Sequence, residues 1–173
     1  ISFDFNQLKE EIRNSNDLSC SQESSTYSFS ASIKETNENN FIEVFTASVD
    51  TKLPEYKSYI SELLNLYNLS KKQAKIKNGK YPVLFTSKAA KELFGFIKDA
   101  INGKMIVEKS SPWVDMLNKQ ILGKNSTIKH DPKFGYMARD FDDEGVEIKS
   151  LNYIKNGVLE NFYFDLITAS KYV

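Results

Sequence analysis

Four carboxylates fall within five residues of this chain, at Asp140, Asp142, Asp143 and Glu144, and Gly145 follows them. Carboxylate oxygens are the ligands that Mg²⁺ and Ca²⁺ prefer, so the cluster could serve an independent hydrolase with a hard metal. Its spacing lacks the alternation of an EF-hand loop, however. A solvated turn that leads into a hairpin is the simplest interpretation. A surface for a substrate or a partner is the third.

The residue types needed for zinc or thiol chemistry are scarce. The chain has one cysteine, Cys20, and one histidine, His130. Cys20 stands between two serines with no histidine nearby, which disfavours a catalytic thiol, and a lone cysteine fits a reducing, cytoplasmic location. His130 lies in a segment expected to be an exposed loop. Catalytic zinc sites usually use at least two His or Cys ligands, so this chain alone should hold no zinc.

Composition bounds the class of protein. A length of 173 residues suits one domain or two small subdomains. The aromatic content of 13% favours strands and disfavours disorder. No apolar run reaches the length of a membrane span. The 23 basic and 23 acidic residues cancel, which disfavours nucleic-acid binding, and the lysine-rich segment 71–80 is expected to be a solvated linker.

The positioning elements before that linker follow from hydrophobic periodicity. Phe5, Leu8 and Ile12 have the spacing of a short helix that Asp4 would cap. The elements expected after it are a polar loop at 14–26, a strand at 27–33, a turn at 37–40, a strand at 41–49, and a helix that begins near Pro54 and buries Tyr56, Ile60, Leu63, Leu64 and Tyr67.

The second half begins with a strand expected at 81–85 and a helix capped by Ser87. The buried stripe of that helix would be Ala90, Leu93, Phe94, Ile97 and Ile101. Asn102-Gly103 should end this helix, a short helix is expected at 113–121, and a loop around 131–135. Asn156-Gly157 lies between strand-like runs and predicts a hairpin with a type I′ turn.

Four segments together resemble the TldD/PmbA family, which is named for modulation of DNA gyrase and comprises bacterial and archaeal metalloproteases. They are Phe-Asp-Asp-Glu-Gly-Val at 141–146, Asn-Gly-Val-Leu at 156–159, Gly-Lys-Tyr-Pro-Val-Leu-Phe at 79–85 and Thr-Ala-Ser-Lys at 168–171. The resemblance implies an α+β fold, in which an antiparallel or mixed sheet with hairpins is combined with two or three amphipathic helices.

The same resemblance implies two domains. Residues 1–78 would form a subdomain of a helix, a β-hairpin and a second helix, equivalent to the middle part of the family fold. Residues 79–173 would form the start of the family's C-terminal domain. Because family members continue further, the chain is expected to be a fragment.

Catalytic members of the family carry a zinc-binding His-Glu-x-x-x-His on the helix after the strand that resembles 83–85. The matching positions here read Lys91-Glu92-Leu93-Phe94-Gly95-Phe96. A protonated lysine has no lone pair to donate and phenylalanine has no donor atom, so Lys91 and Phe96 cannot replace the histidines. On a regular helix Lys91 and Glu92 would face solvent, and Phe96 would lie at the edge of the buried stripe.

The resemblance therefore implies a non-catalytic subunit of the PmbA or TldE type. Its expected partner is a histidine-bearing TldD-like subunit that holds the zinc, with peptides as substrate and further copies of itself as additional partners. No cofactor is expected in this chain. The degenerate metal-site positions are Lys91, Glu92 and Phe96, and Phe141, Asp142, Asp143, Glu144 and Gly145 are expected near a groove or a partner contact. The alternative is a protein-binding regulatory module of the gyrase-modulator type.

Overall fold

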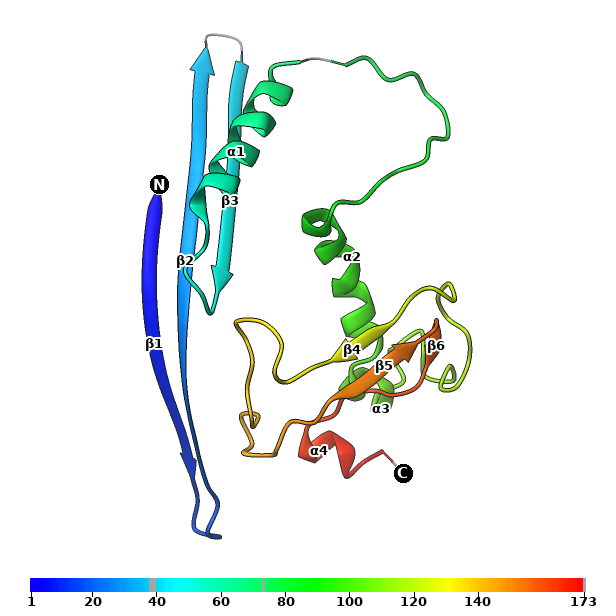
Figure 1. The fold of residues 1–173 in the computed structure, drawn as a ribbon. Helices are drawn as coiled ribbons and strands as arrows, with labels where there is room; N and C mark the ends of the chain where they lie inside the picture. Colours follow the sequence, from blue (N-terminus) through cyan, green and yellow to red (C-terminus); the bar gives the residue numbers. More distant parts are fainter. Residues whose placement is uncertain (38–39, 73, 173) are drawn as a thin grey trace. The chain divides into compact units, whose positions relative to one another are not determined.

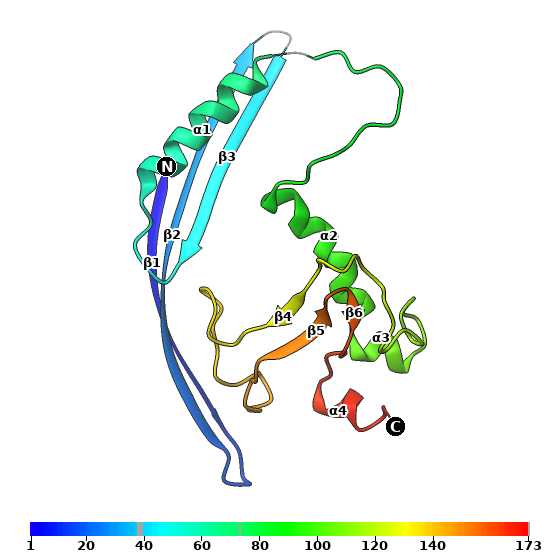
Figure 2. The same ribbon diagram turned by 45° about the vertical axis from the view of Figure 1, so that its right-hand side comes forward.

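A computed structural model of the chain describes residues 1–37, 40–72 and 74–172. The chain divides into two compact units, Ile1–Gly79 with Phe134–Ala138, and Lys80–Lys133 with Arg139–Val173. Among the described residues, the first unit contains a three-stranded antiparallel sheet with one helix, and the second contains another such sheet with three helices (Figures 1 and 2). This arrangement confirms the predicted α+β class. Within the described ranges, no helix combines the length and the hydropathy needed to cross a membrane.

The sheet of the first unit has the order β1-β2-β3. Its strands are β1 (Ser2–Arg13), β2 (Ser19–Asn37) and β3 (Asn40–Asp50), and α1 (Tyr56–Ser70) packs on β2 and β3. The core between α1 and the sheet is formed by Phe29, Ala31 and Leu63, with Ile33, Val44, Tyr59 and Ile60 partly buried around them.

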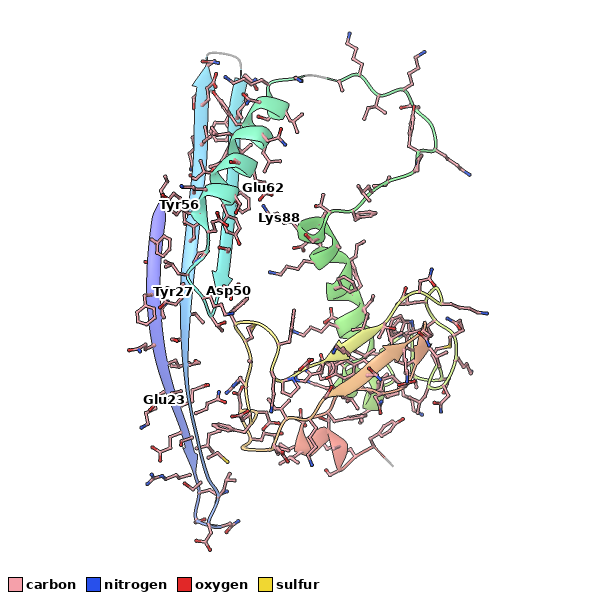
Figure 3. All side chains as sticks on the ribbon, viewed as in Figure 1. Glu23, Tyr27, Asp50, Tyr56, Glu62 and Lys88 are labelled. Carbon is pink, nitrogen blue, oxygen red and sulfur yellow. The ribbon has the colours of Figure 1, made fainter. Side chains whose placement is uncertain are left out.

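The long middle strand β2 has two different neighbours along its length. Its pairing with β3 ends where Tyr27 lies opposite Asp50 (Figure 3). From Ser19 to Thr26 it pairs with β1 alone. This part of the unit is therefore a two-stranded ribbon, and the three-stranded part carries the helix.

The helix predicted over residues 5–12 is wrong, because these residues belong to β1. Phe5 lies opposite Tyr27 and Ile12 lies opposite Cys20. The loop predicted at 14–26 is also wrong beyond residue 18, since β2 begins at Ser19. Backbone pairing along the whole of β1 overrides both the helical spacing and the serine-rich composition.

The other predicted elements of this unit form. The strands at 27–33 and 41–49 lie within β2 and β3. The predicted turn at 37–40 includes residues 38 and 39, which lie outside the described residues. In α1, Glu55 is the N-cap, so Pro54 precedes the first turn.

The stripe predicted for α1 is only partly buried. Leu63 is buried, and Ile60 and Tyr67 are half-buried. Tyr56 and Leu64 are about half exposed, contrary to the prediction. The sheet covers only one side of α1, and these two side chains lie outside the contact.

The described part of the second unit combines three helices with a small sheet. Its elements are α2 (Ser87–Ala100), α3 (Gly103–Val107), β4 (Ile128–His130), β5 (Leu151–Lys155), β6 (Val158–Leu159) and α4 (Leu166–Ala169). The sheet order is β4-β5-β6. Ile101, Ile106, Ile154, Leu159 and Phe162 form its buried core.

The predicted hairpin at Asn156-Gly157 is confirmed. β5 and β6 pair across it, and the backbone φ angles are 49° at Asn156 and 79° at Gly157. Positive φ at both central residues is the requirement of a type I′ turn.

Three predictions for the second unit are wrong. Residues 81–85 form no strand and are exposed, since the described part of the chain offers them no strand to pair with. Thr86, not Ser87, caps α2. Residues 113–121 form successive turns instead of a helix. Asn102 follows α2 as predicted, and its side chain also caps α3 by accepting from Lys104 N at 3.0 Å.

Candidate functional site

The positions predicted to be a degenerate metal site, Lys91, Glu92 and Phe96, lie on α2, which is continuous through Gly95. Lys91 borders a cavity, whereas Glu92 is exposed. Phe96 is 77% exposed, so its predicted place at the edge of the buried stripe is wrong. Only the C-terminal end of α2 enters the core, and the N-terminal turns leave Leu93 and Phe94 about half exposed. The three positions therefore do not converge on one point.

The cavity beside Lys91 has a volume of about 570 Å³, and we call it the α2 cavity. From α2 and its C-terminal end it is lined by Lys91, Phe94, Gly95, Ile97, Lys98 and Ile101. From the sheet side it is lined by Ile128, Lys129, His130, Tyr153 and Tyr163. Its size lies within the range of small-ligand sites, and its inner surface is mainly apolar.

His130 is not the exposed loop residue that its sequence context predicts. It is the last residue of β4 and is half-buried. Its Nε2 atom is buried and has no hydrogen-bond partner among the described residues. A buried polar atom without a partner is costly, but this nitrogen exposes almost no surface, so a ligand in the cavity cannot contact it without a local rearrangement.

Two tyrosines on the sheet side have altered acidity. Burial raises the pKa of Tyr153, and the neighbouring Tyr163 adds to the effect. Burial also raises the pKa of Tyr163, with a further contribution from the negative charge of Asp99. Both hydroxyls therefore stay protonated at neutral pH and can donate hydrogen bonds.

The acidic loop at 140–145 is a closed turn. Asp142 Oδ1 accepts hydrogen bonds from the backbone N–H groups of Glu144 and Val146, both at 2.9 Å. Gly145 has a φ of 77°, and Phe141 is buried beneath the turn. The side chain of Asp142 is thus used to hold the loop itself.

The remaining acidic side chains of the loop face other elements or solvent. Glu144 accepts from Leu166 N at 3.0 Å, at the start of α4. Asp143, about 90% exposed, forms an ion pair with Arg139 at 2.8 Å. Over the residues described, no group of three His, Cys, Asp or Glu side chains could hold a metal ion.

Asp142, Asp143 and Glu144 share a second hollow of about 370 Å³ with Asp165. Tyr163 borders both this hollow and the α2 cavity. The structure thus places Lys91 in one hollow and the acidic loop in the other. Tyr153 and Tyr163 were not predicted as site residues, and their one signal in the sequence is their place in an aromatic-rich segment.

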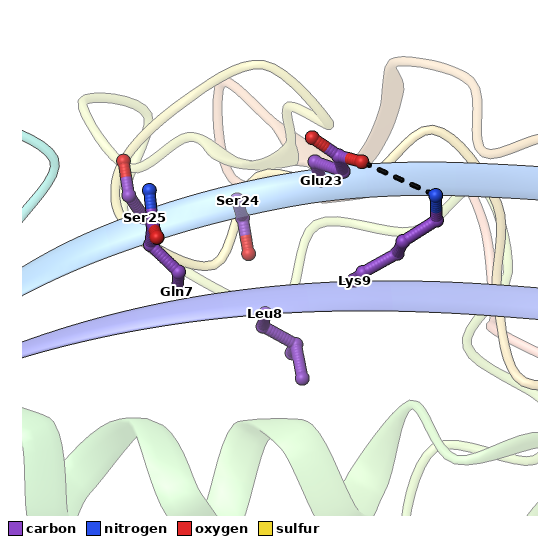
Figure 4. A pocket seen from close by; sticks show the side chains of 6 residues that line it. All are labelled: Gln7, Leu8, Lys9, Glu23, Ser24 and Ser25. Carbon is purple, nitrogen blue, oxygen red and sulfur yellow. Dashed lines mark ion pairs between the residues drawn. The ribbon is translucent and has the colours of Figure 1, made fainter.

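A third hollow lies on the ribbon of β1 and β2, beside Leu8 and Ser24 (Figure 4). Its charged side chains, Lys9 and Glu23, pair with each other at 3.4 Å. The side chains come from two neighbouring strands and do not converge on a common point (Figure 4). This surface offers no arrangement for chemistry.

The same fold is found in solved structures. A protein of Thermotoga maritima, named as a modulator of DNA gyrase, matches with a TM-score of 0.82 and 23% identity, over 98% of this chain and 40% of its own. TldE of Thermococcus kodakarensis matches with a TM-score of 0.79 and 18% identity, over 97% of this chain and 39% of its own.

Sequence relatives extend this likeness. The metalloprotease PmbA of Escherichia coli O157:H7 is 33% identical over 127 residues, which is 72% of this chain and 28% of that protein. The PmbA homologue of Buchnera aphidicola (subspecies Baizongia pistaciae) is 32% identical over 70% of this chain and 27% of that protein. The chain thus spans little more than a quarter of the length of these curated relatives. Residues 78–173 match the PmbA/TldA metallopeptidase C-terminal domain, and the chain therefore belongs to the PmbA/TldD family.

Proposed function

We propose that this chain is part of a non-catalytic, PmbA/TldE-like subunit of a TldD-type metalloprotease complex that acts in peptide proteolysis. The observation that carries the proposal is the state of α2. By the resemblance of residues 91–96 to the family motif, Lys91 and Phe96 stand in place of the two histidines, and the Phe96 side chain is 77% exposed. Neither residue can ligate zinc.

Zinc does not fit the residues present. Positions 91 and 96 lie five residues apart on a continuous helix, so they point about 140° away from each other. Glu92 alone is a single exposed carboxylate. We therefore assign no reaction step to a metal in this chain, and the zinc belongs to the TldD-like partner.

The test is reconstitution of the complete natural protein with the TldD-like homologue of the same organism. We expect the two to co-purify, and we expect casein or peptide cleavage, inhibited by a chelator, only when both are present. Glu92→Gln in this chain should leave cleavage unchanged, whereas the same change in the intact motif of the partner should abolish it. Chelator-sensitive cleavage by this protein alone would overturn the proposal.

A protein-binding regulatory role is the second candidate, and the first unit favours it. Phe41, Phe45 and Val49 of β3 lie on the sheet face opposite α1 and are 60%, 68% and 40% exposed. An exposed apolar row of this kind is typical of contact surfaces. Stable complex formation with no cleavage, in the presence of an intact partner, would favour this role. Both roles place the protein in the cytoplasm, which the single cysteine supports.

A further inference from the structure

We propose that the α2 cavity binds the C-terminal residue of a peptide that ends in an apolar side chain. The side chain would occupy the apolar interior, and the terminal carboxylate would lie at the lysines of α2. The assignment rests on the proposed function in one respect, since it takes a peptide as the ligand.

The interior of the cavity is suited to an apolar side chain. Phe94, Ile97 and Ile101 of the helix side face Ile128 of β4 across it. Ile101 is 3% exposed and belongs to the buried core, so the floor is fixed. A volume of about 570 Å³ exceeds one side chain and leaves room for the adjoining backbone.

The charge around the cavity has one sign. Lys91, Lys98 and Lys129 line it, and no aspartate or glutamate does. Lys129 is already paired with Asp131 at 3.1 Å. Within the part of the chain that the structure describes, Lys91 and Lys98 have no ion-pair partner. Two uncompensated ammonium groups beside an apolar cavity favour a ligand with an apolar body and an anionic end.

The polar groups are spread over a distance that suits a peptide. Lys91 and Lys98 are seven residues apart on a continuous helix, which separates their backbones by about 10 Å along the axis. Tyr153 and Tyr163, whose hydroxyls stay protonated, line the opposite side. A fatty acid has a single polar group and can satisfy one of these positions. A peptide end has a carboxylate and several amide groups, and can satisfy more than one.

Binding to the complete natural protein tests the assignment without any need for catalysis. The probe is acetyl-Ala-Ala-Phe with a free carboxylate, and its C-terminal amide is the matched ligand. Isothermal titration should show that the free acid binds about tenfold more tightly than the amide. Octanoate, which has the charge and an apolar body but no amide groups, should bind more weakly than the peptide acid.

Two variants of this protein sharpen the test. The double change Lys91→Ala and Lys98→Ala should remove the preference for the acid, and Lys124→Ala, an exposed lysine outside the cavity, is its matched control. Gly95→Leu should fill the cavity and abolish binding of both peptides. A Cβ at Gly95 meets no atom within 4 Å, so this variant should fold.

Each contrary result overturns the assignment. Equal binding of acid and amide would exclude recognition of the carboxylate, and octanoate as tight as the peptide would exclude a peptide-specific site. Absence of binding would show that the cavity is closed in the complete protein. If binding fails while the reconstituted complex cleaves peptides, only this assignment falls. If binding holds but no complex with the partner forms, the proposed function falls instead.

Discussion

Replacement of Gly157 by alanine tests how the hairpin of the second unit is held. Gly157 has a φ of 79° and lies under the segment that precedes β4. A Cβ at this position would collide with the side chain of Gln120 and the carbonyl oxygen of Leu122, and would lie 2.7 Å from the carbonyl oxygen of Gly123. The glutamine could swing away, but the two carbonyl oxygens belong to the backbone.

The expected cost has two parts. Positive φ costs alanine about 1–2 kcal/mol relative to glycine. Relief of the collision must also move the neighbouring segment, which breaks or lengthens the hydrogen bonds from Ile121 N to Gly157 O at 2.9 Å and from Gly157 N to Ser126 O at 2.7 Å. At about 1 kcal/mol for each bond, we expect Gly157→Ala to lower the free energy of unfolding by about 3–4 kcal/mol.

Asn156→Ala is the matched control. Asn156 also has positive φ, at 49°, but it already carries a Cβ, so the change adds backbone strain without a collision. We expect it to cost about 1 kcal/mol. Urea melts followed by Trp113 fluorescence measure both, because this sole tryptophan packs against the core of the second unit. Equal costs for the two variants would refute the packing argument, and a neutral Gly157→Ala would refute the hairpin itself.

Three further predictions concern the acidic residues and zinc. Asp142→Ala should lower the free energy of unfolding by about 1–2 kcal/mol, because it removes the acceptor of two backbone N–H groups. Asp143→Asn, at an exposed position, should change it by less than about 0.5 kcal/mol in urea melts. If millimolar Mg²⁺ or Ca²⁺ stabilised wild type but not Asp143→Asn, the loop would be a metal site instead. Hydrogen bonds from the Thr168 side chain and backbone lower the pKa of Asp165. The ionised Asp165 carboxylate therefore stabilises the fold above its unfolded-state pKa, and this stabilisation is lost as pH falls through the lowered native pKa. The urea midpoint should fall more steeply in acid for wild type than for Asp165→Asn, and parallel pH profiles would contradict this. The dialysed chain should contain no stoichiometric zinc by elemental analysis, and one zinc per chain would refute the interpretation of α2.

The parts of the fold that could be predicted from the sequence are those fixed by local chemistry. Asn156 and Gly157 specify their turn because both must adopt positive φ. The helix α2 was predicted from its apolar spacing, although Thr86 caps it and not Ser87. By contrast, Phe5 and Ile12 belong to a strand because β2 lies beside them, and periodicity contains no information about that neighbour.

The candidate site divides in the same way. Lys91 was predicted as a site position because residues 91–96 resemble a family motif, which is a property of the local sequence, and this stays a prediction. His130 and Tyr163 line the α2 cavity together with Lys98, which lies 32 and 65 positions earlier in the chain (130 − 98 and 163 − 98). No local sequence pattern could predict that these residues border one cavity. The strand expected at 81–85 failed for a related reason, since β-forming residues need an edge with which to pair.

The ribbon formed by Asn6–Arg13 and Ser19–Thr26 has a consequence for local opening. A two-stranded hairpin is marginally stable in water. Among the described residues no helix contacts β1, and the side chains of the ribbon are exposed or half-exposed. Its amide hydrogens should therefore exchange with solvent through openings that leave the α1 core around Phe29 and Leu63 intact. The ribbon can therefore open and bend locally, while the three-stranded sheet to which it is joined keeps its structure.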